Sequence, residues 1–350
     1  MFIQEKSGRA DFARAAAAAL AVAAALGSAR AQHAAAGGGG QGREERPRYE
    51  SADAPEFKEK GFIFGRPAKG APEEQLAHAA ALEAAGNIRS AARAYNALVS
   101  EWPTSEHARA AQLKVAEMYA KRGRALDAFR EYQYFIEKFA GADDADFKTA
   151  ITRQYALANA ELARLDKGAF SSSDPDNVAD MFRKIIANAP DWEHAAECQF
   201  KRGAAYEHKR DWLDAAFAYE ALVTRYPDSG LRTDALYRSA FARVKLSDKY
   251  PRDERIMKNA IHSLRMAHTY DASHDSAADA LKHNNRLTAT LTKMNFEKAE
   301  FYDKIRKKPE AAIIAYKAFA KEFDGSPEAE KALKRVAELE KSLKPKTENE

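Results

Sequence analysis

The chain has 350 residues, of which 45% are hydrophobic and 31% are charged, and its net charge is only +4. This length suffices for a large buried core, and the near balance of acids and bases excludes the strongly basic surface of a typical nucleic-acid-binding protein. The single cysteine, Cys198, excludes an intrachain disulfide and a zinc site built on several cysteines.

Residues 1–31 have the pattern of a secretory signal peptide. Basic residues precede an apolar run at 15–26, and residues 29–31 read Ala-Arg-Ala, which predicts cleavage after Ala31. The run of about 12 residues is shorter than the roughly 20 that a membrane-spanning helix needs. Gln32 follows the expected cleavage site. The sequence therefore predicts an exported, soluble chain with no lipid-anchor cysteine at that point.

Low-complexity segments flank the rest of the chain. Residues 32–71 combine a glycine run with scattered charges and show no apolar periodicity, which predicts a disordered tether. Residues 344–350 read KPKTENE and predict a disordered tail.

Between residues 72 and 343 the sequence is rich in helix-forming residues and repeats a spacing. Four times, a small residue is followed 12 or 13 positions later by alanine, then by tyrosine four positions on, then by a second aromatic seven positions further. The repeated positions are Ala79, Ala91 and Tyr95; Ala116, Ala128 and Tyr132; Gly203, Ala215 and Tyr219; and Ala299, Ala312 and Tyr316.

Helix packing explains this spacing. Two antiparallel helices pack with their axes about 8–10 Å apart, and small residues at the crossing permit the closest approach. The tyrosine four residues after the second small residue lies on the same helix face and fills the gap beside the crossing. A leucine at Ala215 is expected to overpack the crossing, at a cost of about 1–3 kcal/mol.

The repeated spacing resembles the tetratricopeptide repeat. The resemblance implies an all-α fold, a right-handed α-solenoid of about six tetratricopeptide-like helix pairs that occupies residues 72–343. A helix at 327–343 is expected to cap the last pair. One degenerate pair ends at Pro190 and carries a polar insertion at 166–177, and another covers about 234–270. An irregular helical bundle is the alternative fold.

Motifs for catalysis are scarce. His194 and Cys198 are four residues apart, beside Glu193 and Glu197, so two metal ligands could share one helix face. The alternative is that Cys198 is a small buried residue and His194 faces solvent. The sequence contains no glycine-rich phosphate loop and no Gly-x-Ser-x-Gly or His-Glu-x-x-His motif. It therefore predicts a non-enzymatic protein without cofactor or metal, and a hydrolase hidden in the array is the weaker hypothesis.

Two sets of polar residues are candidates for binding. The basic cluster at residues 304–308 complements a helix C-terminus, and the alternative is contact with anionic lipid or an acidic partner. In a stack of helix pairs, the first helix of each pair lines the surface that binds a partner segment. Candidate lining groups are Arg238, Gln199, Gln112 and Glu117.

Residues 234–343 resemble the BamD (YfiO) family of outer-membrane β-barrel assembly factors. The resemblance rests on DALYRSAFA from Asp234, on a Glu-x-x-x-Ala-x-x-Tyr-like segment at 296–302, and on AAI followed by an aromatic residue. It implies a non-enzymatic periplasmic scaffold, peripheral to the outer membrane. The implied partners are a BamA-like barrel protein or other envelope proteins and unfolded outer-membrane protein segments. Nucleic acid is not expected, and membrane association is expected only through partners.

The same resemblance identifies Ala315 as a position of interest, because the family often has arginine there and associates the position with contact to BamA. The alternative function is that of a soluble periplasmic adaptor resembling CpoB (YbgF), which links envelope and cell-wall processes. That family combines repeats with an N-terminal coiled coil, and residues 32–70 contain no heptads.

Overall fold

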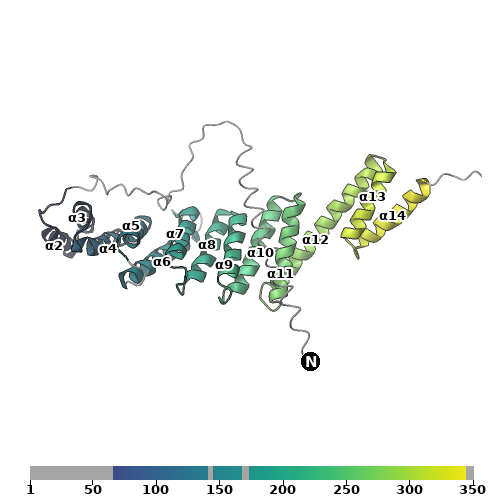
Figure 1. Cartoon of the computed structure of the whole chain (residues 1–350). Coiled ribbons are helices and arrows are strands. Elements are labelled where there is room, and N and C mark those ends of the chain that lie inside the picture. Colours follow the sequence, from purple (N-terminus) through teal and green to yellow (C-terminus); the bar gives the residue numbers. More distant parts are fainter. Residues whose placement is uncertain (1–65, 141–144, 168–172, 344–350) are drawn as a thin grey trace, which may run out of the picture. The chain divides into compact units, whose positions relative to one another are not determined.

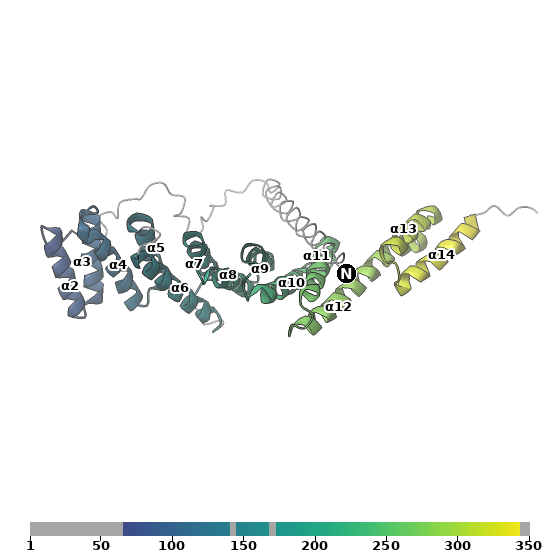
Figure 2. The same ribbon diagram turned by 60° about the horizontal axis from the view of Figure 1, so that its bottom comes forward.

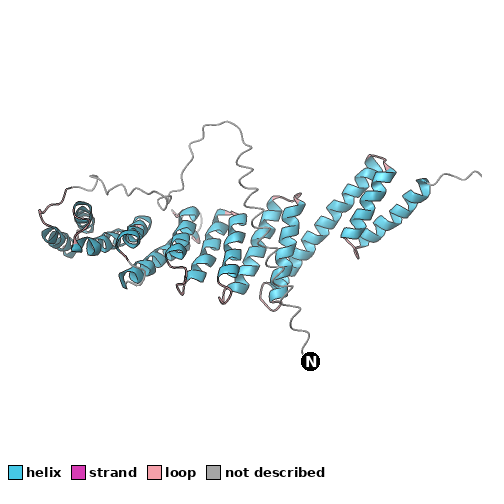
Figure 3. Ribbon diagram, viewed as in Figure 1, coloured by secondary structure: helices cyan, strands magenta, loops and turns pink. Residues whose placement is uncertain are grey.

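The computed structural model describes residues 66–140, 145–167 and 173–343. The predicted signal peptide, almost all of the predicted tether, part of the polar insertion and the predicted tail lie outside these residues. Every regular element in the described part of the chain is a helix, and no strand occurs there (Figure 3). No helix among the described residues is long and apolar enough to cross a bilayer.

The helices follow one another as pairs in chain order (Figures 1 and 2). Each helix packs against the one before it and the one after it. The described α-helices are α2 (Pro72–Ala84), α3 (Ile88–Glu101), α4 (Glu106–Lys121), α5 (Ala125–Phe139), α6 (Ala145–Leu165), α7 (Pro175–Asn188), α8 (Ala195–Lys209), α9 (Trp212–Arg225), α10 (Arg232–Lys249), α11 (Glu254–Tyr270), α12 (Ala277–Glu300), α13 (Pro309–Glu322) and α14 (Pro327–Leu343).

These helices form an α-solenoid of tetratricopeptide-like repeats, as predicted. The pairs run from α2–α3 to α12–α13, so the described residues contain six of them. α14 packs on α13 and also contacts α12, which is the position of a capping helix. The two degenerate units of the sequence are the third pair, α6–α7, and the fifth pair, α10–α11.

Turn residues explain where the helices end. Gly86 and Gly123 follow the first helices of the first two pairs with φ of 76° and 69°, a conformation that only glycine adopts without strain. In the fourth pair Arg210 takes this position with φ of 61°. Proline at the first turn begins α2, α7 and α13, where its missing N–H costs no helical hydrogen bond.

The core lies between successive helices. It combines alanines, which let the helices approach closely, with aromatic and aliphatic side chains that fill the space beside them. In the third pair, Phe182 and Ile185 are fully buried together with Cys198 of the next helix. Each pair therefore shares its core with its neighbour and depends on it for stability.

The last pair departs from the regular pattern. α12 ends at Glu300 and continues directly into one wide π-helical turn, η3 (Phe301–Ile305), before the chain reaches α13. Isolated π-helical turns are rare and are frequently found at functional sites.

Candidate functional site

The structure buries all twelve repeat positions that the sequence singles out. The seven alanines are at most 1% exposed, the four tyrosines are at most 2% exposed, and Gly203 is also buried. In the fourth pair the tyrosine packs directly on the small residue: a Cβ built at Gly203 would lie 2.7 Å from Cε1 and Cζ of Tyr219. The glycine therefore makes room for an aromatic ring from the facing helix.

Three of these tyrosines lie beside a carboxylate that also pairs with a lysine or arginine of a later helix. We term each such group a Tyr–acid–base cluster, and the sequence analysis did not predict it. In the first pair, the Tyr95 hydroxyl donates a hydrogen bond to Glu83 at 3.0 Å. Lys121 of α4 donates to the other oxygen of the same carboxylate at 2.8 Å. This contact with Lys121 holds the pKa of Glu83 below its ordinary value, while burial and the Glu83 carboxylate raise the pKa of Tyr95.

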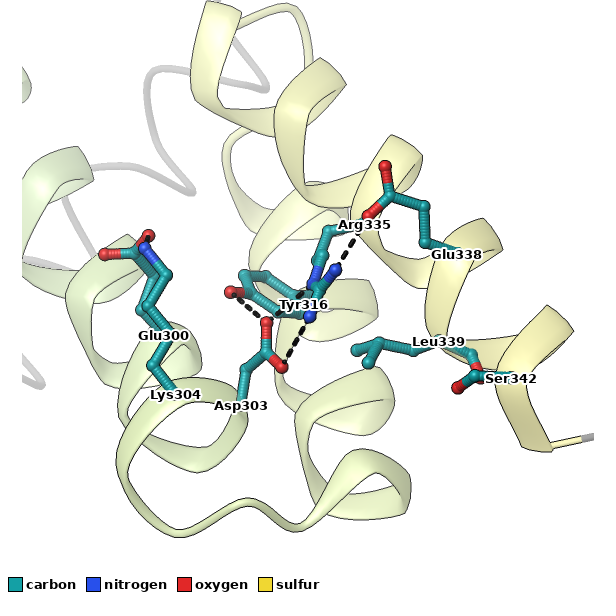
Figure 4. A network of polar contacts seen from close by, with 8 residues as sticks. All are labelled: Glu300, Asp303, Lys304, Tyr316, Arg335, Glu338, Leu339 and Ser342. Carbon is teal, nitrogen blue, oxygen red and sulfur yellow. Dashed lines mark hydrogen bonds and ion pairs between the residues drawn. The ribbon is translucent and has the colours of Figure 1, made fainter.

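The last pair contains the most extensive cluster, drawn in Figure 4. Asp303 of η3 accepts hydrogen bonds from Arg335 of α14, at 2.7 Å from Nε and 3.1 Å from Nη2. The Tyr316 hydroxyl of α13 donates to the same carboxylate at 3.3 Å. Arg335 lowers the pKa of Asp303, and burial together with Asp303 raises the pKa of Tyr316 to about 12. This cluster joins three helical segments at one carboxylate.

The third cluster, in the fourth pair, has a different electrostatic balance. Glu207 forms an ion pair with Arg238 of α10 at 3.0 Å. The Tyr219 hydroxyl makes no direct hydrogen bond to a described residue, and burial followed by the charge of Glu207 raises its pKa. Burial also raises the pKa of Glu207, although Arg238 opposes the shift. Asp303 and Glu207 occupy equivalent positions in their repeats. The surroundings stabilise the charged form of Asp303 and destabilise the charged form of Glu207.

A sequence signal for these clusters exists. The acid lies four residues after the small residue of its helix and 12 or 13 residues before the tyrosine. In the second pair Ala120 occupies the corresponding position, and burial raises the pKa of Tyr132 to about 12. Each cluster contains one carboxylate, from the first helix of its pair or, for Asp303, from η3, and burial raises the pKa of the tyrosine beside it.

Two of the four candidate lining groups are not on the surface. Gln199 and Gln112 are at most 1% exposed. Each side-chain amide donates to a backbone carbonyl of the facing helix, Ala218 O at 2.7 Å and Glu131 O at 2.9 Å, and Gln75 does the same to Ala94 O at 2.9 Å. Their expected role in lining a binding surface is therefore wrong. They stabilise the pairs from inside by satisfying buried polar groups.

The other two candidates lie at the surface in ion pairs. Arg238 is half exposed and pairs with Glu207, and Glu117 pairs with Lys114 at 3.1 Å. Ala315, the position of interest in the family resemblance, packs against the core of the last pair.

The His194–Cys198 pair does not form a metal site among the described residues. Cys198 is fully buried, and burial raises the pKa of its thiol to about 12. The His194 ring stacks on Tyr155 with centroids 4.9 Å apart, and its Nδ1 lies 3.1 Å from Glu197. Nowhere in the described ranges do three or more histidine, cysteine, aspartate or glutamate side chains gather as metal ligands.

Exposed apolar side chains gather in one part of the chain. All large hydrophobic residues that are exposed among the described residues occur from Tyr250 onward, in the last two pairs and the capping helix. Ile314 of α13 and Ile305 of η3 are the most exposed, at 70% and 69%, and Leu333 of α14 is 54% exposed. A contiguous apolar patch is typical of an interaction surface, so these residues are candidates for contact with a partner.

An open groove lies beside this region. The turn between α10 and α11 and Lys298 of α12 line a space of about 760 Å³ with Lys249, Tyr250, Arg252 and Arg255 among its residues. Phe301 and Tyr302 follow Lys298 by three and four residues, so they lie on the same side of the helix. Lys298 therefore lines the groove and lies shortly before the η3 turn in the chain.

Comparisons with known proteins found one matching family model and several similar solved structures. A family model described as "YfiO: Outer membrane lipoprotein" matches residues 167–350. A search of curated proteins found no matching relative. A solved tetratricopeptide repeat protein from Parabacteroides merdae is 13% identical, with a TM-score of 0.28 over 76% of this chain and 98% of that chain. The TPR2AB domain of yeast Sti1, solved as a complex with pHSP90, is 18% identical, with a TM-score of 0.25 over 63% of this chain and 86% of that chain.

Proposed function

The chain belongs to the YfiO (BamD) family of outer membrane lipoproteins, and we propose that it acts in the periplasm as a non-enzymatic scaffold for the assembly of outer-membrane β-barrel proteins. In this role it binds a BamA-like barrel protein, other envelope proteins, or unfolded segments of outer-membrane proteins. Its export depends on the predicted signal peptide at residues 1–31.

The distribution of exposed apolar side chains carries this proposal. Ile314 and Leu333 extend from α13 and α14 into solvent, although burial of such side chains is favourable. α13 and α14 pack on one another, and the Arg335–Asp303 contact fixes α14 relative to η3. The two side chains are therefore presented by helices that are joined to one another. The same part of the chain lies within the range that the YfiO family model matches.

Purification from the native envelope tests the proposal. A tagged full-length chain is expected to reach the envelope fraction and to copurify with a BamA-like barrel protein. The amount of that partner that copurifies is expected to fall at least tenfold in the double variant Ile314→Glu/Leu333→Glu. Each glutamate replaces an apolar contact with a charge that would lose its hydration when buried in the interface. The change should leave the fold intact, since both positions are exposed.

The matched control is Arg89→Glu/Arg93→Glu, which changes two exposed positions of α3 in the first pair and should retain the partner. Recovery of the wild type only in the free soluble fraction without a barrel partner would overturn the proposal. Cross-linking to Tol-system proteins in place of the barrel protein would support the CpoB-like alternative.

A further inference from the structure

The corner between α12 and α13 exposes cations beside apolar side chains. We call this surface the basic corner and define it as Phe301, Tyr302, Lys304, Ile305, Arg306, Lys307 and Lys308, all of which are exposed.

The backbone of the basic corner directs these side chains outward and the side chain of Asp303 inward. The amide of Arg306 donates to Phe301 O at 2.9 Å and that of Lys308 donates to Tyr302 O at 3.0 Å, which closes the wide turn. Asp303 points inward to Tyr316 and Arg335, and its side chain is only 6% exposed. The outward surface of the turn consequently carries apolar and cationic groups without that carboxylate.

The charges of the basic corner are largely uncompensated. Lys304 pairs with Glu300, and the Arg306 guanidinium lies 5.6 Å from the centre of the Phe301 ring. Within the part of the chain that the structure describes, Arg306, Lys307 and Lys308 form no ion pair. Three adjacent cations therefore face solvent on one turn.

The neighbouring groove extends the positive charge. Lys249, Arg252 and Arg255 line it and are exposed. The acids between them are engaged by the protein itself: Asp253 accepts a hydrogen bond from the amide of Ile256 at 3.0 Å, and Glu254 pairs with Lys298. The groove therefore adds three exposed cations close in the sequence to one another.

We propose that the basic corner binds the surface of an anionic phospholipid bilayer, with Phe301, Tyr302 and Ile305 entering the interface while the cations contact lipid phosphates. Apolar and aromatic side chains next to lysine and arginine suit the boundary between headgroups and acyl chains. An acidic peptide fits less well, since it would pair with the cations but leave the exposed side chains of Phe301, Tyr302 and Ile305 in solvent. The contact would add to the partner-mediated membrane association that the family resemblance implies.

Vesicle binding tests this proposal directly. The full chain is mixed with vesicles of phosphatidylcholine alone or of phosphatidylcholine with phosphatidylglycerol, and bound protein is measured by sedimentation. We expect binding that requires phosphatidylglycerol and weakens with added salt. The triple variant Arg306→Gln/Lys307→Gln/Lys308→Gln should bind about 100-fold more weakly, because each cation near an anionic surface contributes roughly a factor of five.

The control variant is Arg89→Gln/Arg93→Gln/Arg122→Gln. It removes three exposed cations from the first two pairs, including Arg122, which lies 5.9 Å from the Tyr119 ring much as Arg306 lies on Phe301. Both triple variants keep the same N-terminal segment and lose the same charge. An equal loss in the two variants would show that only net charge matters and would overturn the proposal.

Insertion of the apolar groups is measured separately. Cys198 is fully buried, so an Ile305→Cys variant can be labelled selectively with an environment-sensitive dye. The dye should shift to the blue on vesicles that contain phosphatidylglycerol, whereas the same dye at Arg93→Cys should not.

The proposal would be contradicted if the emission of the dye on the Ile305→Cys variant did not shift, or if the wild type bound equally to both kinds of vesicle. Binding of an acidic Glu–Tyr copolymer that is lost in the corner triple variant, with no vesicle binding by the wild type, would assign the basic corner to a protein partner. The copurification test of the scaffold function uses Ile314 and Leu333, so the two proposals can fail independently.

Discussion

The ring of Tyr219 occupies the space where a side chain at Gly203 would begin. A Cβ at position 203 would lie only 2.7 Å from two ring carbons and 3.0 Å from a third. Because both residues are buried, the ring has little room to move away. The packing of Tyr219 from α9 therefore requires glycine at this position of α8, despite the low helix propensity of glycine.

Replacement of this glycine by alanine should destabilise the fourth pair. We expect Gly203→Ala to lower the free energy of unfolding by about 1–2 kcal/mol, since overpacking outweighs the gain in helix propensity. Chemical unfolding followed by circular dichroism measures the change.

The control for this variant is Gly230→Ala, where an added Cβ meets nothing within 4 Å. Its effect should stay within about 0.5 kcal/mol of the wild type. Tyr219→Leu should also partly relieve the penalty of Gly203→Ala when the two changes are combined. Equal stability of Gly203→Ala and Gly230→Ala would disprove the close packing.

Loss of the Asp303 carboxylate should loosen the end of the array. In Asp303→Asn the charge-assisted bonds to Arg335 are lost, and we expect a cost of about 1.5–3 kcal/mol. Hydrogen exchange should become faster in α13 and α14, while α2–α5 should be unaffected. Glu338→Gln is the control, because Glu338 contacts the same arginine at 2.7 Å from the exposed side. Similar exchange in both variants would argue against a special role for Asp303.

The pH dependence of stability should have opposite signs at Asp303 and Glu207. Arg335 lowers the folded-state pKa of Asp303, so its stabilisation is present above the unfolded pKa of about 3.9 and is lost as the pH falls through the folded value. Burial raises the folded-state pKa of Glu207 above its ordinary value of 4.5. Its contribution is present below the unfolded pKa and is lost as the pH rises through the folded value.

Unfolding measured across the acidic range should separate the two residues. The stability penalty of Asp303→Asn should shrink as the pH is lowered. The stability of Glu207→Gln relative to the wild type should increase as the pH rises from the ordinary glutamate value of 4.5 toward neutrality. Parallel profiles for the two variants would contradict this assignment.

Reactivity of Cys198 should report on the integrity of the array between α6 and α9. Burial raises the thiol pKa to about 12, and the thiolate is the nucleophile, so alkylation of the folded protein near neutral pH should be very slow. Unfolding in denaturant should restore the rate of an ordinary cysteine. Rapid alkylation of the native protein, with unchanged circular dichroism, would show that the site is open.

Much of the fold could be predicted from the sequence because its main signal is local. The spacing that joins Ala215 to Tyr219 lies on one helix, and the spacing from Gly203 to Ala215 lies within one pair. The bases of two Tyr–acid–base clusters were missed because each lies far from its acid in the sequence. Arg238 is 31 residues from Glu207, in the next helix pair, and Arg335 is 32 residues from Asp303, in the capping helix. Their pairing becomes evident only when the stacking of the pairs is known.

Two features were predicted wrongly or missed because they are unusual for their residue types: the buried glutamines and the π-helical turn η3. Gln112 and Gln199 were expected at the surface because long amides are usually exposed, yet each reaches a carbonyl across its own pair. The η3 turn was missed because residues 296–302 look like continuous helix. Lys307, with φ of 50°, is a residue type that seldom adopts this conformation.

The location of the Arg335–Asp303 bond has a consequence for where the protein can be truncated. A fragment that stops at Glu322 would retain η3 and α13 but would leave the Asp303 carboxylate without its counterion and uncover Tyr316. An unpaired acid and a solvated aromatic surface at one terminus favour misfolding and self-association. Fragments intended to behave as independent proteins should therefore extend through Leu343.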